Sequence, residues 1–244
     1  MENKNKVLGI LGGLGPMSSA YFYELITSHT KAQKDQDHID IILSSRATTP
    51  DRTDFILGKS ADDPSVTMAK EIKKLCDYGA DVIAISCNTA HFFYEKLLEA
   101  STVPVLNMVE ESVQICKNNG VKKVGILATK GTISANIYAK VCQKQNIDYY
   151  NPTEGTQELV SKIIYEQIKA GKPASRDYFD MIKAELTDNM CDAAILGCTE
   201  LSVAKNQLNL GSFYVDSLDA LAYSAIVSCG KTPCGFEELF NGSK

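Results

Sequence analysis

The chain has 244 residues, of which 23% are charged, and a formal net charge of -5. A chain of this length forms one large domain or two small ones, and its mild acidity argues against nucleic acid and membrane surfaces as partners. No apolar run approaches the ~18 residues that span a bilayer. Residues 1–6 are polar and lead directly into an apolar segment, which leaves no room for a signal peptide, so we expect a cytoplasmic protein.

The first half of the chain predicts strands that alternate with helices. Strands are expected at residues 7–11, 39–43, 81–85 and 103–106. Helices are expected from residue 17 onward and at residues 65–78, 92–100 and 109–119. The polar residues 45–64 are predicted to form a long loop, and because such loops are often functional in compact α/β proteins, this one is a candidate for substrate contacts.

A glycine-rich turn, residues 12–16, joins the first strand to its helix. The spacing departs from the dinucleotide-binding pattern, because Ser18 stands where the third glycine belongs and the second strand ends in Ser44 and Ser45 without a carboxylate. We therefore expect a tight turn whose glycines let a small ligand or a neighbouring loop approach the backbone.

The pattern of elements restarts after about residue 108. Strands are expected at residues 123–128, 193–196 and 213–215, and helices at residues 133–145, 156–170, 173–189 and 216–228. Nearly the same spacing separates Cys87 from Cys198 as separates Gly9 from Gly125, which indicates an internal duplication.

The duplication predicts an α/β protein of two pseudo-symmetric lobes, each a parallel sheet flanked by helices, with the active site in the cleft between them. We place the first lobe at residues 1–108 and the second at residues 109–215. The C-terminal helix and tail, residues 216–244, are expected to pack back on the first lobe.

Cys87 and Cys198 occupy equivalent places in the two lobes. Each follows a short buried strand and precedes a helix, and ligands of open α/β sheets bind beyond the carboxyl ends of the strands. A single cysteine in this position is usually a packing residue, but its repetition in both halves makes the pair a candidate for chemistry. The other cysteines and the three histidines lack the spacing of a zinc site, and we expect no metal and no structural disulfides.

Two thiols that face one cleft can invert a carbon centre. Helix amino termini favour a thiolate, and a thiolate on one face of a carbon acid with a thiol on the other can remove and return the α-proton. The carbanion formed between these steps needs positioned hydrogen-bond donors. The candidate donors follow strands or begin helices; they are Asn88, Thr89, Thr129, Thr132 and Thr199.

Five motifs resemble those of the aspartate/glutamate racemase family, in particular its aspartate racemase branch. They lie at residues 9–16, 50–53, 87–91, 127–132 and 197–200 and cover nearly the whole chain in the family's order. The resemblance implies an isomerase that interconverts L- and D-aspartate without pyridoxal phosphate or another cofactor. It also implies a homodimer that binds a small amino acid as its substrate. Cys87 and Cys198 would be the acid/base pair.

The resemblance further assigns substrate contacts. Arg52 and Lys169 would meet the side-chain carboxylate of the substrate, and the α-carboxylate or amino group would be met by Asn88, Thr89 and Thr129. Two further predicted contacts follow the second cysteine; they are Thr199 and Glu200. The chain departs from the family at residues 46–49, where Arg-Ala-Thr-Thr replaces an amide-rich run and adds a cation. Aspartate is therefore the first candidate substrate, and glutamate or another amino acid is the second.

Other functions remain open on the sequence alone. Enzymes on the same scaffold include hydantoin racemase, maleate isomerase and arylmalonate decarboxylase, although decarboxylation needs only one thiol. A non-enzymatic amino-acid-binding protein is a further alternative, for which we would expect one cysteine to be lost. His91 is expected to be a hydrogen-bonded core residue rather than a third catalyst.

Overall fold

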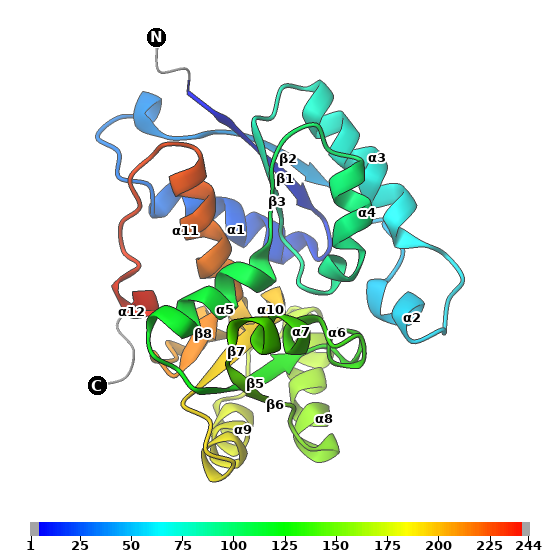
Figure 1. Ribbon diagram of the computed structural model, residues 1–244, viewed down its shortest axis with the longest axis vertical. Helices are drawn as coiled ribbons and strands as arrows, with labels where there is room; N and C mark the ends of the chain where they lie inside the picture. Colours follow the sequence, from blue (N-terminus) through cyan, green and yellow to red (C-terminus); the bar gives the residue numbers. More distant parts are fainter. Residues whose placement is uncertain (1–4, 241–244) are drawn as a thin grey trace.

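The computed structural model describes residues 5–240 and contains two four-stranded parallel sheets (Figure 1). The first sheet has the order β2-β1-β3-β4, and its strands in sequence are β1 (Val7–Gly12), β2 (Asp40–Ser45), β3 (Val82–Ile85) and β4 (Val105–Leu106). The second sheet has the order β6-β5-β7-β8, with strands β5 (Lys123–Ala128), β6 (Asp148–Tyr150), β7 (Ala193–Gly197) and β8 (Tyr214–Asp216). The equal strand orders confirm the two pseudo-symmetric α/β lobes.

Helices connect the strands and cover the sheets. In the first half they are α1 (Pro16–Ser28), α2 (Arg52–Ile56), α3 (Pro64–Asp77), α4 (Tyr94–Glu99) and α5 (Met108–Asn118), with short 3₁₀ helices at Asp35–Asp37 and Thr89–Phe93. In the second half they are α6 (Lys130–Ser134), α7 (Ile137–Gln145), α8 (Glu154–Lys162), α9 (Arg176–Asp188), α10 (Thr199–Leu208), α11 (Ser217–Ser228) and α12 (Glu237–Phe240). A π-helical segment, Ile163–Ile168, extends α8.

Side chains alternate between the two faces of each sheet, because successive residues of a strand point to opposite sides. In β1, Ile10 belongs to the largest core cluster, whereas the adjacent Leu11 belongs to a second cluster. In β7, Ile195 belongs to the same large cluster as Ile10, whereas Leu196 belongs to a third. One continuous apolar core therefore joins the two lobes, and each lobe has a smaller core of its own.

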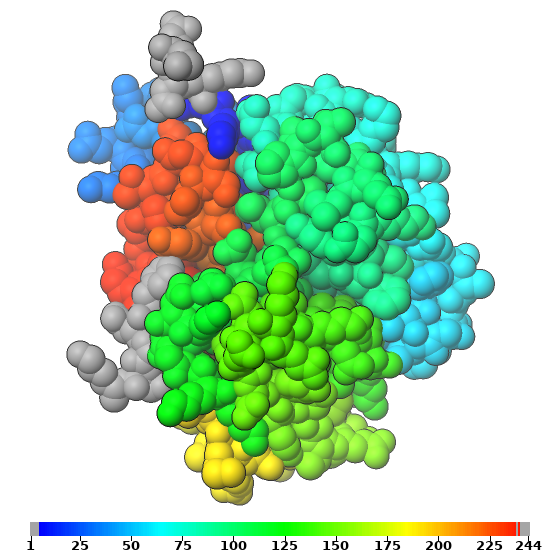
Figure 2. All heavy atoms as spheres, in the orientation of Figure 1, coloured from blue at the N-terminus to red at the C-terminus, as the bar shows by residue number. Residues whose placement is uncertain are grey.

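Two helices cross between the lobes. α5 follows the last strand of the first sheet but packs against β7 and β8 of the second, and α11 follows the last strand of the second sheet but packs against β3 and β4 of the first. The space-filling view shows α11, in orange, beside the blue segments of the first half (Figure 2). The lobe boundaries at residues 108 and 215 stay a proposal, in which α5 belongs to the second lobe and α11 to the C-terminal segment that packs back on the first.

Several elements differ from the prediction. The polar segment after β2 contains the short helix α2, whose first turn is capped by the Asp51 carboxylate accepting from the amide of Asp54 at 2.9 Å. The helix expected at residues 133–145 is divided, because Asn136 adopts a left-handed conformation with φ of 55°. The edge strand β6 was not predicted from the sequence.

The glycine-rich turn after β1 is packed against its neighbours. Gly13 has a φ of 81°, and a Cβ there would lie 2.3 Å from the backbone nitrogen of Arg46. A neighbouring loop thus approaches this turn, which is one of the two expectations for its glycines. Parts of two other predictions, the polar amino terminus and the C-terminal tail, fall on residues 1–4 and 241–244 and lie outside the described residues. Within residues 5–240, no helix has the length and apolar character needed to cross a membrane.

Candidate active site

Nine of the ten residues predicted for the site line one cavity between the lobes, and the tenth, Thr132, does not line it. The cavity has an empty volume of about 290 Å³, part of it open to solvent. Cys87 follows β3 of the first sheet, and Cys198 follows β7 of the second, so each lobe contributes one thiol. The remaining seven predicted residues around the cavity are Arg52, Asn88, Thr89, Thr129, Lys169, Thr199 and Glu200.

Cys198 is the N-cap residue of α10 and is buried. Its Sγ donates a hydrogen bond to Oε2 of Glu200, two residues along the chain, at 3.0 Å. Burial raises the pKa of the Cys198 thiol well above its usual value, and the Glu200 carboxylate raises it further, while Lys169 lowers it. The protonated form of Cys198 is therefore favoured.

Cys87 is held by a buried histidine. The Nδ1–H of His91 donates to the carbonyl oxygen of Cys87 at 2.9 Å, and His91 Nε2 accepts from the amide of Met108 at 3.1 Å. Because Met108 begins α5, His91 connects the turn after β3 to a helix that crosses between the lobes. Both ring nitrogens have partners, which fits the expected structural role of this histidine.

His91 should make the protein less stable in acid. Its burial lowers the pKa of the imidazole from 6.5 to about 4, so the unfolded chain binds a proton at a pH where the folded protein does not. Stability is therefore lost as the pH falls from about 6.5 to about 4, by about 3 kcal/mol in all. We expect urea unfolding to show a smaller loss of stability between pH 7 and pH 5 in His91→Gln than in the original protein. Equal losses in the two proteins would contradict this role of His91.

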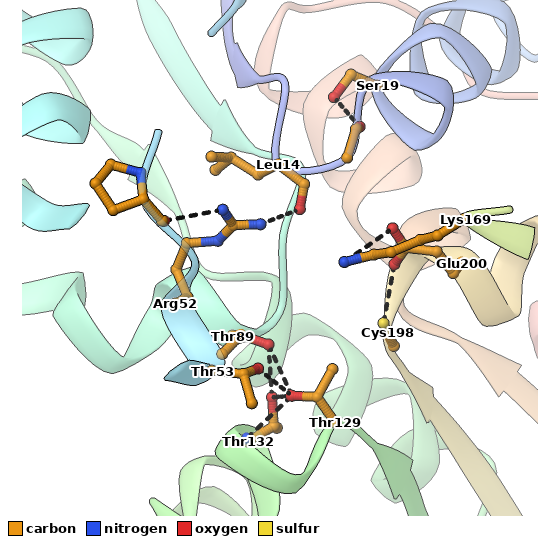
Figure 3. A network of polar contacts seen from close by, with 12 residues as sticks. Leu14, Ser19, Arg52, Thr53, Thr89, Thr129, Thr132, Lys169, Cys198 and Glu200 are labelled. Carbon is orange, nitrogen blue, oxygen red and sulfur yellow. Dashed lines mark hydrogen bonds and ion pairs between the residues drawn. The ribbon is translucent and has the colours of Figure 1, made fainter. Parts of the chain in front are cut away.

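Four threonine hydroxyls form a cluster across the interface between the lobes (Figure 3). Thr89 Oγ1 lies 3.1 Å from Thr129 Oγ1 and 2.9 Å from Thr132 Oγ1. Thr53 of α2 donates to Thr129 at 3.3 Å, and Thr129 caps α6 by accepting from the amide of Thr132 at 3.2 Å. Since Thr53 and Thr89 come from the first lobe and the other two from the second, the cluster binds the lobes together at the cavity wall.

Asn88 lines the cavity, but other elements bind both ends of its side chain. Nδ2 donates to Ser217 Oγ at 3.0 Å, and Oδ1 accepts from the hydroxyl of Tyr138. Ser217 begins α11 and Tyr138 lies in α7, so Asn88 joins the turn after Cys87 to both. Its side chain is fixed in place before any ligand arrives.

Arg52 is the first residue of α2, and only 8% of it is exposed. Its guanidinium donates to the carbonyl oxygens of Pro50 at 3.1 Å and Leu14 at 2.6 Å, while Nε has no partner (Figure 3). Across residues 5–240, no carboxylate lies within ion-pair distance of Arg52. A buried cation without a counter-charge is unfavourable, so the cavity suits an anionic ligand.

Lys169 reaches the cavity from the end of the π-helical segment. Its amide donates to the carbonyl of Ile164, five residues earlier, at 3.0 Å, which is the wide turn of a π-helix. Such turns are frequent at functional sites. Here the turn places Lys169 Nζ 4.8 Å from the centre of the Tyr165 ring and 3.9 Å from Oε1 of Glu200. Burial is the largest single influence and would lower the pKa of the ammonium, but Glu200, Cys198 and the other nearby groups together raise that pKa.

The additional cation at residues 46–49, Arg46, is not part of the site. Arg46 is exposed and does not line the cavity, and its positive charge acts on the carboxylate of Glu71. Residues that the sequence analysis did not assign to the cavity are Leu14, Asp51, Thr53 and Tyr165. Tyr165 lies four positions before Lys169, and this helical spacing is the one signal that could have identified it.

The matching family model, described as Asp/Glu/Hydantoin racemase, covers residues 11–225. The chain belongs to this family. It is therefore an amino-acid racemase, an isomerase. The structure of Picrophilus torridus aspartate racemase is 31% identical, with a TM-score of 0.82 over 97% of this chain and 99% of that one.

Other racemases are similar to this one over most of its length. The broad specificity amino-acid racemase RacX of Bacillus subtilis is 26% identical over 224 residues, which are 90% of this chain and 96% of RacX. A glutamate racemase from Francisella tularensis in complex with D-glutamate is 23% identical, with a TM-score of 0.63 over 98% of this chain and 85% of that one. At that identity the likeness shows the fold alone.

Proposed function

We propose that this racemase interconverts L- and D-aspartate with Cys87 and Cys198 as its two acid/base residues. One observation carries the proposal: the two thiols line the same cavity as a buried guanidinium, Arg52, that has no carboxylate partner within residues 5–240. A dicarboxylic amino acid supplies both things that this cavity needs, an α-hydrogen between the thiols and a carboxylate for the cation.

The reaction proceeds through two proton transfers. The thiolate of one cysteine removes the α-proton, and the electron pair of the broken C–H bond is delocalised toward the α-carboxylate. The thiol of the other cysteine then delivers its own proton to the opposite face of the carbon. Donors at the cavity wall, among them Thr89, Thr129 and Thr199, would stabilise the charge that grows on the carboxylate.

Arg52 and Lys169 would bind the side-chain carboxylate. Guanidinium groups form paired, charge-assisted hydrogen bonds with carboxylates, and the unpartnered Nε of Arg52 leaves a donor free for one. Lys169 Nζ lies 3.9 Å from Oε1 of Glu200. This distance is long for an ion pair, so the ammonium can bind a second anion. Because Arg46 lies outside the cavity, the departure from the family at residues 46–49 adds no further charge to the site.

Incubation with a panel of L-amino acids, followed by chiral chromatography, tests the substrate. We expect D-aspartate to form with the highest kcat/KM, because the two cations that line the cavity suit a second carboxylate and the family resemblance favours aspartate. Glutamate is the second candidate, since one extra methylene is commonly discriminated by only about 1–3 kcal/mol. Faster conversion of an uncharged or basic amino acid than of aspartate would contradict the proposed role of Arg52.

The resemblance to the family also supports a homodimer, while the cytoplasmic location expected from the amino-terminal sequence stays a proposal. Light scattering during size-exclusion chromatography measures the mass of the assembly directly. A mass of two chains is expected, and a mass of one chain at micromolar concentration would contradict the dimer.

A further inference from the structure

Glu200 is a buried carboxylate that contacts one thiol of the site and not the other. Only 4% of Glu200 is exposed, and its two oxygens have different partners: Oε2 accepts from Cys198 at 3.0 Å, and Oε1 lies 3.9 Å from Lys169 Nζ (Figure 3). Gly15 of the opposite lobe makes room for this carboxylate, since a Cβ at Gly15 would lie 2.9 Å from Oε1. The position of Glu200 is therefore determined from three sides.

The charged and titratable groups that face Cys198 act in opposite directions. Glu200 of α10 opposes ionisation of the thiol, and Lys169 favours it. The Tyr165 hydroxyl, from the π-helical segment, is uncharged when protonated, and a thiolate at Cys87, across the cavity, would oppose a second thiolate at Cys198. The amino terminus of α10 favours a thiolate at its N-cap position, but it contributes only a partial charge. A full negative charge in contact with Sγ outweighs it.

We propose that Glu200 is a positioning residue that keeps Cys198 protonated, so that Cys87 is the thiol that acts as the first base. This inference rests on the proposed two-thiol racemisation and deepens it. The burial-driven rise of the Cys198 pKa acts in the same direction. Around Cys87, His91 is neutral and donates to the backbone rather than to Sγ, and Lys169 interacts electrostatically with the thiol.

The consequence for the catalytic cycle follows from the proton balance. The resting enzyme reacts with the enantiomer whose α-hydrogen faces Cys87, and the turnover leaves a thiol at Cys87 and a thiolate at Cys198. That thiolate lies beside the carboxylate of Glu200, and the two negative charges repel each other. Cys198 therefore takes up a proton from solvent, and Cys87 releases to solvent the proton that it removed from the substrate. Glu200 thus resets the enzyme toward one of its two protonation states.

The pH dependence of thiol alkylation tests the inference without using activity. Cys198 is measured in a Cys87→Ser protein and Cys87 in a Cys198→Ser protein, with iodoacetamide as the probe and peptide mass spectrometry to identify the labelled residue. We expect the alkylation midpoint of Cys198 to lie above that of Cys87. Adding Glu200→Gln to the Cys87→Ser protein should lower the Cys198 midpoint by about one pH unit or more, which is about tenfold more thiolate at a given pH.

Asp51 provides the matched control, because it lines the same cavity but caps α2 instead of contacting a thiol. Asp51→Asn should leave the Cys198 midpoint unchanged. If Glu200→Gln does not fold, Glu200→Asp decides, since withdrawing the carboxylate by one methylene should also lower the Cys198 midpoint. A Cys198 midpoint at or below that of Cys87, or one that neither variant lowers, would overturn the inference. Because the readout is titration, this result is independent of whether the cysteines racemise aspartate.

Discussion

Cys87→Ala and Cys198→Ala should each abolish racemisation. Each variant lacks one of the two groups that move the α-proton, and a single positioned acid or base commonly contributes roughly 10²–10⁴-fold to a rate. Because the two cysteines act in sequence on the same carbon, loss of either one interrupts the conversion in both directions. Chiral chromatography after incubation with L-aspartate and, separately, with D-aspartate measures this loss.

Cys234→Ala is the control for the cysteine variants. Cys234 is exposed and lies outside the cavity, so its removal should leave both rates unchanged. Thermal unfolding of all three variants separates loss of chemistry from loss of folding. Normal racemisation by both cavity variants would remove the two-thiol mechanism from consideration.

Arg52→Met should lower kcat/KM for aspartate by roughly 10²–10³-fold, since removing one partner of a buried ion pair commonly costs about 3–5 kcal/mol. The loss should appear mainly in KM, because Arg52 would hold the substrate's side chain and not the reacting carbon. The folded protein need not lose much stability, because the substitution also removes a buried charge that has no carboxylate partner in the described structure. Initial rates over a range of aspartate concentrations give both parameters.

Arg46→Met is the matched control for charge. Arg46 belongs to the same segment of the chain, six positions before Arg52, but it is exposed and outside the cavity. It should leave kcat/KM nearly unchanged. Equal losses in the two arginine variants would show that the overall positive charge of the loop, and not a specific contact of Arg52, binds the substrate.

The sheets and the paired thiols could be predicted because their signals are local. The strands before Cys87 and Cys198 are short apolar runs that are buried on both faces, and such runs are recognisable without knowledge of what covers them. The same element order in both halves then places both thiols at the carboxyl ends of strands. A shared cavity follows from that topology.

The positions of α5 and α11 were expected from the lobe boundaries and not from any feature of the helices themselves. An apolar helix face shows that the helix is packed, but it does not show which sheet it packs against. In the structure α5 packs against β7 and β8 of the second sheet, and α11 packs against β3 and β4 of the first.

The electrostatics of the cavity also depend on distant contacts. Arg52 has the sequence context of a solvated loop residue, and its burial depends on the carbonyl of Leu14, 38 positions away. The link between Glu200 and Lys169 depends on a π turn that no spacing in the sequence announces. These contacts determine whether a cysteine that lines the cavity is protonated. The chemistry of the site could therefore be predicted only in part from the sequence.

The distribution of deuterium in the first turnovers tests the two-thiol mechanism most directly. L-aspartate is incubated with the enzyme in heavy water, and both enantiomers are recovered early and analysed by mass spectrometry. With two bases, the D-aspartate formed should carry one deuterium at the α-carbon, while the remaining L-aspartate keeps its hydrogen, because the thiol that returns a proton is not the thiol that removed one. Deuterium in the recovered L-aspartate at the same rate as in the product would instead indicate a single base, and it would contradict the two-thiol mechanism.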